Sequence, residues 1–266
     1  MSRLPGDSAI QRLDFDLLWC IVEMNANMFD DDKRALETTL ATSRVCCTWR
    51  TSILNMPSIW ARLIDLDHLH WRTVDFRHEI IRRSGTALLW VKANGCVGHH
   101  LNDPIRCAKY VLSTIGENWG QIQRLEAEIT IDYVDSTDWE PLNLAAPHLE
   151  SLNLTRPMRD FSDFLGRNLS LFGGNAMMLH TMVLNAVFTI SETLGVLMAT
   201  KNLVSLTLGQ TVADRTTSPL PRVPLPKLAQ LAITVFDNPF PGALLLYCMR
   251  IPSACLVSFS AMSIHT

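Results

Sequence analysis

The sequence predicts a mixed α/β fold, in which a block of three helices is followed by an irregular solenoid built on a parallel sheet. Two observations predict this fold. Apolar residues recur at helical spacing over residues 12–64, and the pattern L-x-x-L-x-L recurs in the second half of the chain. We therefore expect a flexible tail over residues 1–11, a helical domain over 12–64, a linker helix over 65–85 and a repeat domain over 86–266.

The composition favours a folded protein and excludes several classes. Of the 266 residues, 48% are hydrophobic and 18% are charged, which is enough apolar material for a core. With 23 basic and 26 acidic residues the net charge is −3, so nothing favours binding to nucleic acid or to an anionic membrane. The seven cysteines form no CxxC pair, which fits a reducing compartment. We expect no signal peptide and a soluble protein of the cytoplasm or nucleus, with no membrane contact.

The first expected helix begins near Asp14, whose side chain is a suitable N-cap. Its apolar residues follow at steps of four, one, three and one, which places them in one stripe. They are Leu13, Leu17, Leu18, Ile21 and Val22.

Three further helices are expected before residue 86. Asp30 to Asp32 open one that carries Leu36 and Leu40. Another carries an apolar series with a spacing of four and ends at a proline, which cannot continue a helix; its residues are Val45, Trp49, Ile53 and Pro57. The last runs from about Val74 to Arg83 and is followed by Gly85.

From residue 86 onward short strands alternate with connecting segments. The run Leu88–Val91 is a strand candidate, and Asp103 with Pro104 marks the start of a helix. The apolar face expected for that helix consists of Ile105, Ala108, Leu112 and Ile115.

The strongest signal in this half is the repeated L-x-x-L-x-L pattern. Clear copies begin at Leu149, Leu179, Leu203 and Leu228, and weaker ones at Ile122 and Leu256. The intervals between first positions are 27, 30, 24, 25 and 28 residues, in or near the range of leucine-rich repeats. Alternate residues of a strand face the same side, so one copy cannot bury its leucines alone and the copies must stack.

The connections between copies are expected to differ from one another. Ser191 is the expected cap of a helix that carries Leu194, Leu197 and Met198. A second return helix is expected around Phe161, Phe164 and Leu165, closed near Gly173, and the four prolines between residues 211 and 227 predict an extended connection. The asparagine or cysteine usual three residues after each copy is absent, so the solenoid should be irregular. No polar cap follows the last copy, so we expect either a shortened chain or a fraying last repeat.

The segment from Leu13 to Trp60 resembles an F-box. "VCCTWR" at Val45–Arg50 and "LNMPSIW" at Leu54–Trp60 carry most of the resemblance, and "FDLLWCIVE" at Phe15–Glu23 is similar to the first F-box helix. "IIRRSGTALLWV" at Ile80–Val91 is similar to the junction in many fungal F-box proteins with degenerate leucine-rich repeats.

The resemblance implies a function. F-box proteins bind the Skp adaptor of cullin–RING ubiquitin ligases, and a second domain presents a protein substrate. The resemblance therefore implies an SCF-type substrate adaptor that does no chemistry itself and needs neither metal nor cofactor. The positions that match the motif, some for the core and some for the adaptor, are Leu17, Leu18, Ile21, Val45, Trp49 and Trp60.

Two other hypotheses stay open. The chain could be a repeat scaffold that no longer recruits a ligase, since Asp14 stands where the family has proline. It could also be a cysteine hydrolase, in which case one of Cys96, Cys107, Cys248 or Cys255 would be unusually reactive.

Other candidate sites give weaker signals than the F-box motif, and a structural role is the favoured interpretation for each. The candidates are a metal site at Cys96, His99, His100 and Cys107, a redox pair at Cys46 and Cys47, and a cation site at Asp30 to Asp32.

Overall fold

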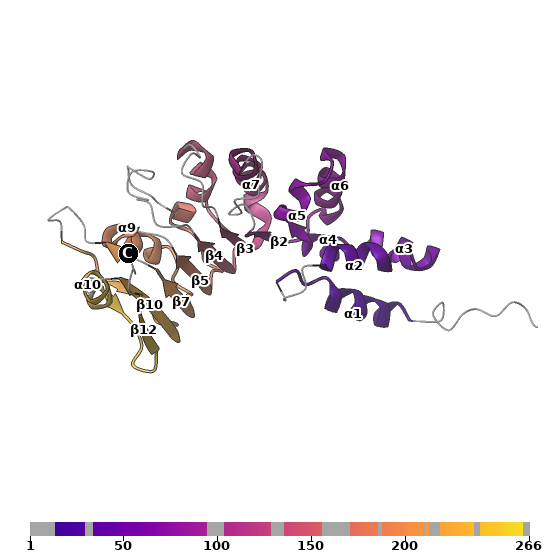
Figure 1. The fold of residues 1–266 in the computed structure, drawn as a ribbon. Helices are drawn as coiled ribbons and strands as arrows, with labels where there is room; N and C mark the ends of the chain where they lie inside the picture. The colour runs from indigo at the N-terminus through magenta and orange to yellow at the C-terminus, as the bar shows by residue number, and fades with distance from the viewer. Residues whose placement is uncertain are drawn as a thin grey trace, which may run out of the picture. The chain divides into compact units, whose positions relative to one another are not determined.

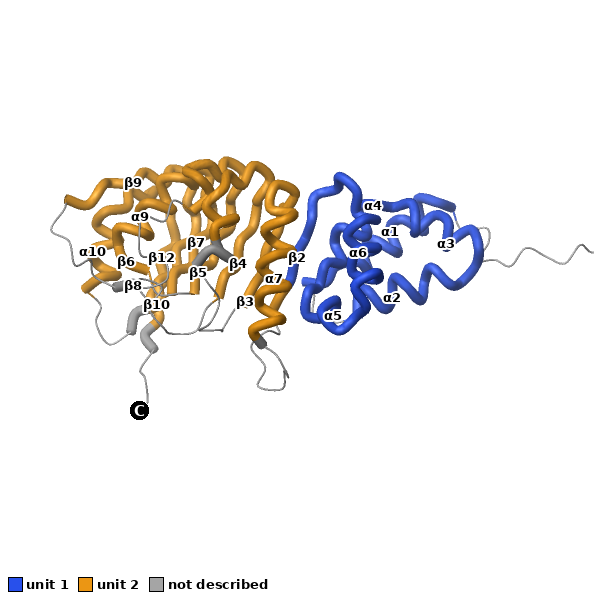
Figure 2. Tube along the Cα trace, turned by 90° about the horizontal axis from the view of Figure 1, so that it is seen from above, with its two compact units in different colours: residues 1–92 blue, residues 93–266 orange. Residues whose placement is uncertain are grey.

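The computed structural model describes residues 14–29, 34–94, 104–128, 136–155, 171–185, 188–209, 211–212, 219–236 and 240–262. The chain is mixed α/β, as the sequence predicts, and its described strand pairs are parallel. It divides into two compact units, residues 1–92 and 93–266, which Figure 2 colours blue and orange. The expected tail, residues 1–11, lies outside the described residues.

The first unit is mainly helical (Figure 1). Its elements are α1 (Phe15–Asn25), α2 (Ala35–Thr42), α3 (Cys47–Leu54), α4 (Pro57–Ala61), β1 (Ile64–Asp65), α5 (Leu66–His70), α6 (Val74–Ser84) and β2 (Leu89–Ala93). Strands β1 and β2 pair in parallel, Ile64 opposite Val91. Gly85 ends α6 with a positive φ of 54°, a conformation that glycine adopts at little cost.

Two details of this unit differ from the sequence prediction. Val45 does not lie on a helix, because α3 begins only at Cys47, where the Cys46 sulfur caps it by accepting from the Trp49 N–H at 3.5 Å. Asp14 occupies the N-cap position of α1 but makes no side-chain capping bond.

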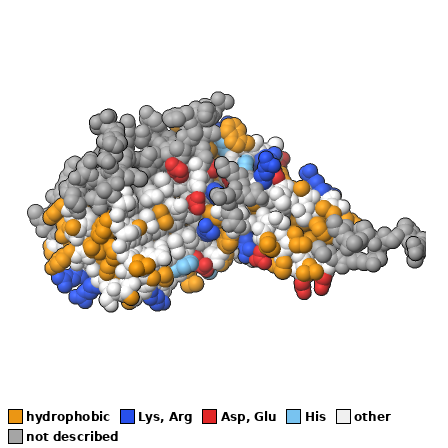
Figure 3. Space-filling view, turned by 60° about the horizontal axis from the view of Figure 1, so that its bottom comes forward, with side chains coloured by type: hydrophobic (Ala, Val, Ile, Leu, Met, Phe, Trp, Pro, Cys, Tyr) orange, Lys and Arg blue, Asp and Glu red, His pale blue; other side chains and the backbone are white. Residues whose placement is uncertain are grey.

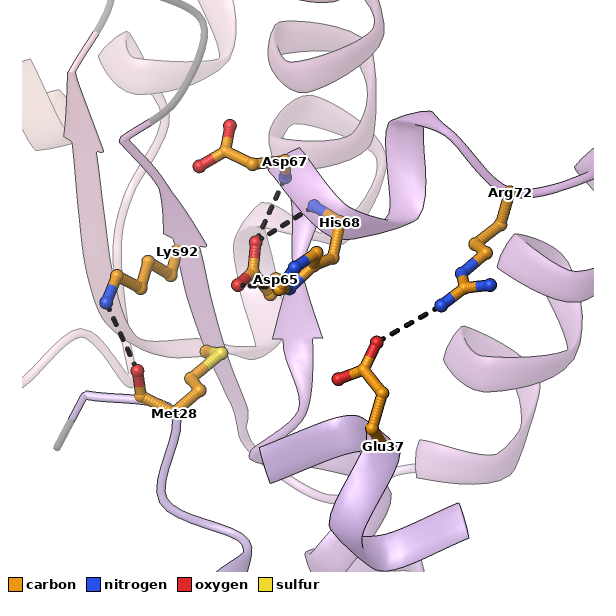
Figure 4. Close-up of polar contacts among 7 residues, drawn as sticks. All are labelled: Met28, Glu37, Asp65, Asp67, His68, Arg72 and Lys92. Carbon is orange, nitrogen blue, oxygen red and sulfur yellow. Dashed lines mark hydrogen bonds and ion pairs between the residues drawn. The ribbon is translucent and has the colours of Figure 1, made fainter. Parts of the chain in front are cut away.

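Residues 65–85, expected to form a linker helix, hold α5 and α6 and are bonded to the earlier helices. The Arg72 guanidinium pairs with Glu37 on α2 at 3.1 Å, as Figure 4 shows. Farther along, the Arg83 guanidinium donates to the Leu54 carbonyl at 3.3 Å, and the Lys92 ammonium donates to the Met28 carbonyl at 3.2 Å. The contacts of Arg72 and Arg83 join residues 65–85 to α2 and α3, and the contact of Lys92 joins β2 to the chain just after α1.

The start of α5 is fixed by Asp65. One carboxylate oxygen accepts the backbone N–H groups of Asp67 at 3.1 Å and His68 at 3.2 Å, and the other lies 3.2 Å from the His68 ring nitrogen (Figure 4). The carboxylate satisfies two of the N–H groups that a helix N-terminus leaves without partners.

The second unit is built on parallel strands connected by helices and 3₁₀ turns. Its helices are α7 (Pro104–Asn118), α9 (Ile190–Met198) and α10 (Phe240–Cys248), with 3₁₀ segments η2 (Trp119–Gln121), η3 (Ser136–Asn143) and η4 (Leu171–Gly174). The main strands are β3 (Ile122–Glu128), β4 (Ser151–Thr155), β5 (Thr181–Asn185), β7 (Ser205–Leu208), β10 (Gln230–Phe236) and β12 (Leu256–Met262). Short parallel pairs are β6 (Phe188–Thr189) with β8 (Thr211–Val212), and β9 (Val223–Pro224) with β11 (Met249–Arg250).

The six main strands lie side by side in the order β3-β4-β5-β7-β10-β12, which Figure 1 shows. Equivalent positions of the repeated pattern are opposite one another. One row runs Leu125, Leu152, Met182, Leu206 and Leu231, and these side chains are buried. The row of Ala127, Leu154, Leu184, Leu208 and Ile233 follows it. The pattern therefore predicts both the strands and their register.

The last copy is an exception. Sequence spacing suggests that it begins at Leu256, but Leu256 lies opposite Gln230, and Val257 and Phe259 lie opposite Leu231 and Ile233. The equivalent first position is therefore residue 254, two residues before the predicted one. Leu256 points to the opposite side of the sheet from the core.

The return helices also depart in detail from the prediction. The N-cap of α9 is Thr189, two residues before the expected cap, because Thr189 and Glu192 form a capping box. The Thr189 hydroxyl accepts from the Glu192 N–H at 3.2 Å, and the Glu192 carboxylate accepts from the Thr189 N–H at 2.9 Å. Ile105, which is expected on the apolar face of α7, is exposed, and Met198 on α9 is also exposed. The helix expected around Phe161 lies outside the described residues.

Candidate functional site

The exposed face of α1 is the most distinctive surface of the first unit. Leu17 exposes 56% of its surface, whereas the adjacent Leu18 exposes 3%. Helix residues are about 100° apart around the axis, so Leu17, Cys20, Ile21 and Met24 fall within an arc of about 100°. All four are exposed. We call these four residues the α1 stripe.

The opposite face of α1 is packed into the unit. Leu18 and Val22 are buried, and α1 contacts α2 and α3. Glu23 anchors the helix at its side: its carboxylate accepts from the Trp19 indole N–H at 3.1 Å and pairs with Arg62, just after α4, at 2.8 Å. Burial on one side and this ion pair set the rotation of α1 about its axis, so the α1 stripe points away from the core.

The two tryptophans of the F-box-like motif belong to the core. Trp60 is buried, and its indole N–H donates to the Ile53 carbonyl at 2.9 Å. The Arg83 guanidinium lies over its ring, 5.4 Å from the centroid, which adds a cation–π contact from α6. Trp49 is also buried, on α3. Neither ring is available to a partner in this conformation.

The six candidate residues from the sequence therefore separate into two groups. Leu18, Trp49 and Trp60 are buried, and Leu17, Ile21 and Val45 are exposed. The structure adds Cys20 and Met24 to the exposed group on α1. Their spacing from Leu17, three and seven residues, is helical and readable in the sequence, but which side of α1 faces inward is not.

The surroundings of the α1 stripe combine apolar and acidic side chains. Figure 3 shows apolar side chains gathered on the helical unit with carboxylates beside them. Asp14 and Asp16 are exposed around the start of α1. A partner that covers this region would need an apolar patch bordered by neutral or basic groups.

The second unit offers a different kind of surface. The strand residues that alternate with the buried rows face the other side of the sheet, which we call the outer face. One row of the outer face runs Ser151, Thr181, Ser205 and Gln230, and the next runs Asn153, Val183, Thr207 and Ala232. On β4, β5, β7 and β10 the side chains of these rows are uncharged, and most of them offer a hydroxyl or amide group for hydrogen bonds. On β3 the same two rows begin with the charged residues Arg124 and Glu126.

The weaker candidates gain no support among the described residues. Cys96, His99, His100 and Asp30 to Asp32 lie outside them, and the described residues contain no group of three or more His, Cys, Asp and Glu that could hold a metal ion. Cys107 and Cys248 are buried, and burial raises the pKa of the Cys255 thiol. A raised pKa lowers the thiolate fraction, which is the reactive form.

No helix of the described residues is both long and apolar enough to cross a bilayer. Comparison of the chain with protein-family models, with curated proteins and with solved structures found no match.

Proposed function

We propose that this chain is the substrate-recognition subunit of an SCF-type cullin–RING ubiquitin ligase. In this proposal the α1 stripe and Val45 bind the Skp adaptor, and the repeat unit holds a protein substrate. The chain supplies proximity, because it raises the effective concentration of the substrate near the ubiquitin carrier.

The observation that carries the proposal is the exposure of three motif positions on a well-anchored helical unit. Leu17, Ile21 and Val45 are exposed, although folding could have buried them. Exposed apolar side chains arranged along one helix face are typical of a protein–protein contact. The sequence resemblance supplies the identity of the partner.

The outer face supports the second half of the proposal. Parallel strands in register present a broad surface whose side chains take no part in the core, as in repeat proteins that bind other proteins. We propose that the unit is a degenerate leucine-rich-repeat solenoid and that its outer face contacts the substrate.

The test is the affinity of the purified chain for a Skp adaptor, measured by titration calorimetry. Leu17→Glu and Ile21→Glu place charges on the α1 stripe without removing a buried side chain. Each should weaken binding at least tenfold, about 1.4 kcal/mol, because desolvating an unpaired carboxylate opposes the contact. Val74→Glu is the matched control, since Val74 is also an exposed aliphatic residue of the same unit, at the start of α6. It should bind as the unchanged chain does.

Two outcomes would contradict the proposal. If the unchanged chain does not bind the adaptor, the scaffold hypothesis replaces it. If the stripe variants and the Val74 control bind equally well, the adaptor contact lies elsewhere. Cys20 provides an independent readout, because its thiol lies in the α1 stripe and is exposed. A saturating concentration of adaptor should slow the alkylation of Cys20. It should affect the alkylation of Cys47 less, because Cys47 is exposed outside the stripe.

A further inference from the structure

The charged residues of the second unit are unevenly distributed. Between residues 193 and 262, four of the described residues are basic and none is acidic. The two acidic residues of this stretch, Asp214 and Asp237, lie outside the described residues. The four basic residues are exposed, and none of them forms an ion pair with a described carboxylate. They are Lys201, Arg222, Lys227 and Arg250.

Two of these residues lie on one face of the short parallel pair of β9 and β11. Pro224 lies opposite Arg250, and both are exposed. The residues before them, Val223 and Met249, also lie opposite each other and are buried. Because strand residues alternate between faces, Arg222 lies on the same side as Pro224, and its Cα atom is about 8 Å from that of Arg250. We call Arg222, Pro224 and Arg250 the arginine face.

The Arg222 side chain is held in place by α10. Its guanidinium donates to the Tyr247 hydroxyl at 2.9 Å and lies over the Tyr247 ring, 5.2 Å from the centroid. A guanidinium has five N–H donors, so this bond leaves most of them for a partner. Because the side chain is already ordered, binding a ligand there costs less conformational entropy.

The backbone below the arginine face is also fixed. The buried Leu225 donates its backbone N–H to the Arg250 carbonyl at 2.9 Å, which ties the two strands together. Pro221, Pro224 and Pro226 restrict φ along this stretch. The face consists of side chains that stand perpendicular to the strand pair, so a strand added at either edge of the pair would leave it open.

The two lysines continue the positive surface along the neighbouring turns. Lys227 lies in the turn before β10, just after Pro226, and Lys201 lies in the turn before β7. These turns are adjacent, because β7 pairs with β10 and the Ala229 N–H donates to the Val204 carbonyl at 2.8 Å. In Figure 3 the basic side chains at the β12 end of the unit stand apart from the carboxylates.

The arrangement fits the carboxylates of an extended protein segment. A guanidinium binds a carboxylate through two parallel hydrogen bonds. Side chains two residues apart on an extended chain are about 7 Å apart, close to the spacing of the two arginines. The whole chain has a net charge of −3, which disfavours a polyanion as large as DNA or a membrane. A short segment is less affected, since charges more than about 8 Å away are largely screened at physiological salt.

We infer that the arginine face binds an extended acidic segment of a partner protein. Two carboxylates of the segment, two residues apart, pair with Arg222 and Arg250. Lys227 and Lys201 attract further acidic residues of the same segment. This surface lies on a different unit from the α1 stripe, and the inference does not depend on the proposed ligase function.

Fluorescence anisotropy tests the inference with a labelled peptide of about ten residues in which Glu alternates with Ser. The peptide should bind the unchanged chain at low ionic strength, and added salt should weaken the binding. The same peptide with Gln in place of Glu should bind at least tenfold more weakly, because a neutral amide cannot form the charge-assisted hydrogen bonds.

A pair of double variants locates the binding site. Arg222→Gln combined with Arg250→Gln should weaken binding of the Glu peptide at least tenfold. The matched control combines Arg106→Gln with Lys109→Gln, which removes two exposed positive charges from α7 of the same unit. Both double variants have the same net charge, and the control should bind the peptide nearly as the unchanged chain does. Circular dichroism checks that both fold.

The inference is overturned if the unchanged chain does not bind the Glu peptide, if the Glu and Gln peptides bind equally, or if the two double variants bind alike. Vesicles of phosphatidylserine and phosphatidylcholine provide a further arm. Vesicle binding that the arginine variant loses, without binding of the peptide, would overturn the inference and assign the face to a membrane. The arginine variant should still bind the Skp adaptor as the unchanged chain does, so a failure here is distinguishable from a failure of the proposed function.

Discussion

Leu17 and Leu18 are adjacent in the sequence, yet Leu17 exposes 56% of its surface and Leu18 exposes 3%. About 100° of helix rotation separates their side chains, and α1 packs against the rest of the unit on only one side. The same short motif therefore supplies both the core of the helical unit and its exposed apolar face. Single substitutions separate these two contributions.

Leu18→Ala should lower the free energy of unfolding of the helical unit by about 2–5 kcal/mol, because it removes buried methyl groups and leaves a cavity. Leu17→Ala should change the same quantity by less than about 0.5 kcal/mol, because the side chain is already in water. Urea unfolding followed by circular dichroism measures both. Equal losses would mean that α1 is packed on the Leu17 side as well.

Trp60→Ala should lower the free energy of unfolding by about 3–5 kcal/mol, since the indole is buried among the helices of the unit. Trp60→Phe retains an aromatic ring but leaves the Ile53 carbonyl without its donor, and should cost about 1–3 kcal/mol. Thermal unfolding compares the two variants. A phenylalanine variant as unstable as the alanine variant would show that packing of the full indole, rather than the hydrogen bond, dominates.

Met182→Ala should destabilise the repeat unit by about 2–5 kcal/mol, because Met182 is buried in the row between Leu152 and Leu206. Val183→Ala is the matched control on the same strand, because the Val183 side chain lies on the outer face. It should cost less than about 1 kcal/mol. Guanidinium unfolding measures both, and the reverse order would contradict the assigned faces of β5.

Thr189→Ala should lower stability by about 1 kcal/mol, because it removes the hydroxyl half of the capping box at the start of α9. Thr189→Ser keeps a hydroxyl at the same position and should restore most of the loss. Chemical unfolding of the three proteins measures the difference. A serine variant no more stable than alanine would assign the effect to the lost methyl group.

Cys255 should react slowly with iodoacetamide in the folded protein at neutral pH, since burial raises its pKa and keeps the thiol protonated. The alkylation rate of Cys255 should rise as the pH increases toward the raised pKa. Over that range it should approach the alkylation rate of Cys255 in urea-unfolded protein. Peptide mapping after timed alkylation follows each cysteine, with exposed Cys20 as the reference. Fast labelling of native Cys255 at neutral pH would instead favour the hydrolase hypothesis.

The repeated pattern predicts the sheet well because burial itself imposes the spacing. Leu152 and Leu154 must face one core, and only a strand places both residues there while Asn153 faces away. The frame of the last copy is not determined in this way. Residues 254, 257 and 259 and residues 256, 259 and 261 both fit the apolar pattern, and only the pairing with β10 selects the first set.

Three further differences between the sequence predictions and the structure have causes in local structure or in packing. Ser191 is the expected cap of α9, although the capping-box signature of Thr189 and Glu192 is present in the sequence. Val45 fits an apolar spacing of four with Trp49, but the Cys46 sulfur caps the helix one residue later. The division of α1 into buried and exposed sides depends on how α2 and α3 pack, which no local pattern of α1 encodes.

The equivalent first positions of the strand copies are residues 122, 149, 179, 203, 228 and 254, so consecutive strands are 27, 30, 24, 25 and 26 residues apart, yet their leucines stay in line. The differences in length are absorbed entirely by the returning segments. Evolution can therefore insert or delete residues in those segments without disturbing the hydrophobic rows. Evolution can also replace the Ser, Thr and Asn residues of the outer face one at a time. The binding preference of that face then changes, while the buried rows and the strand order stay the same.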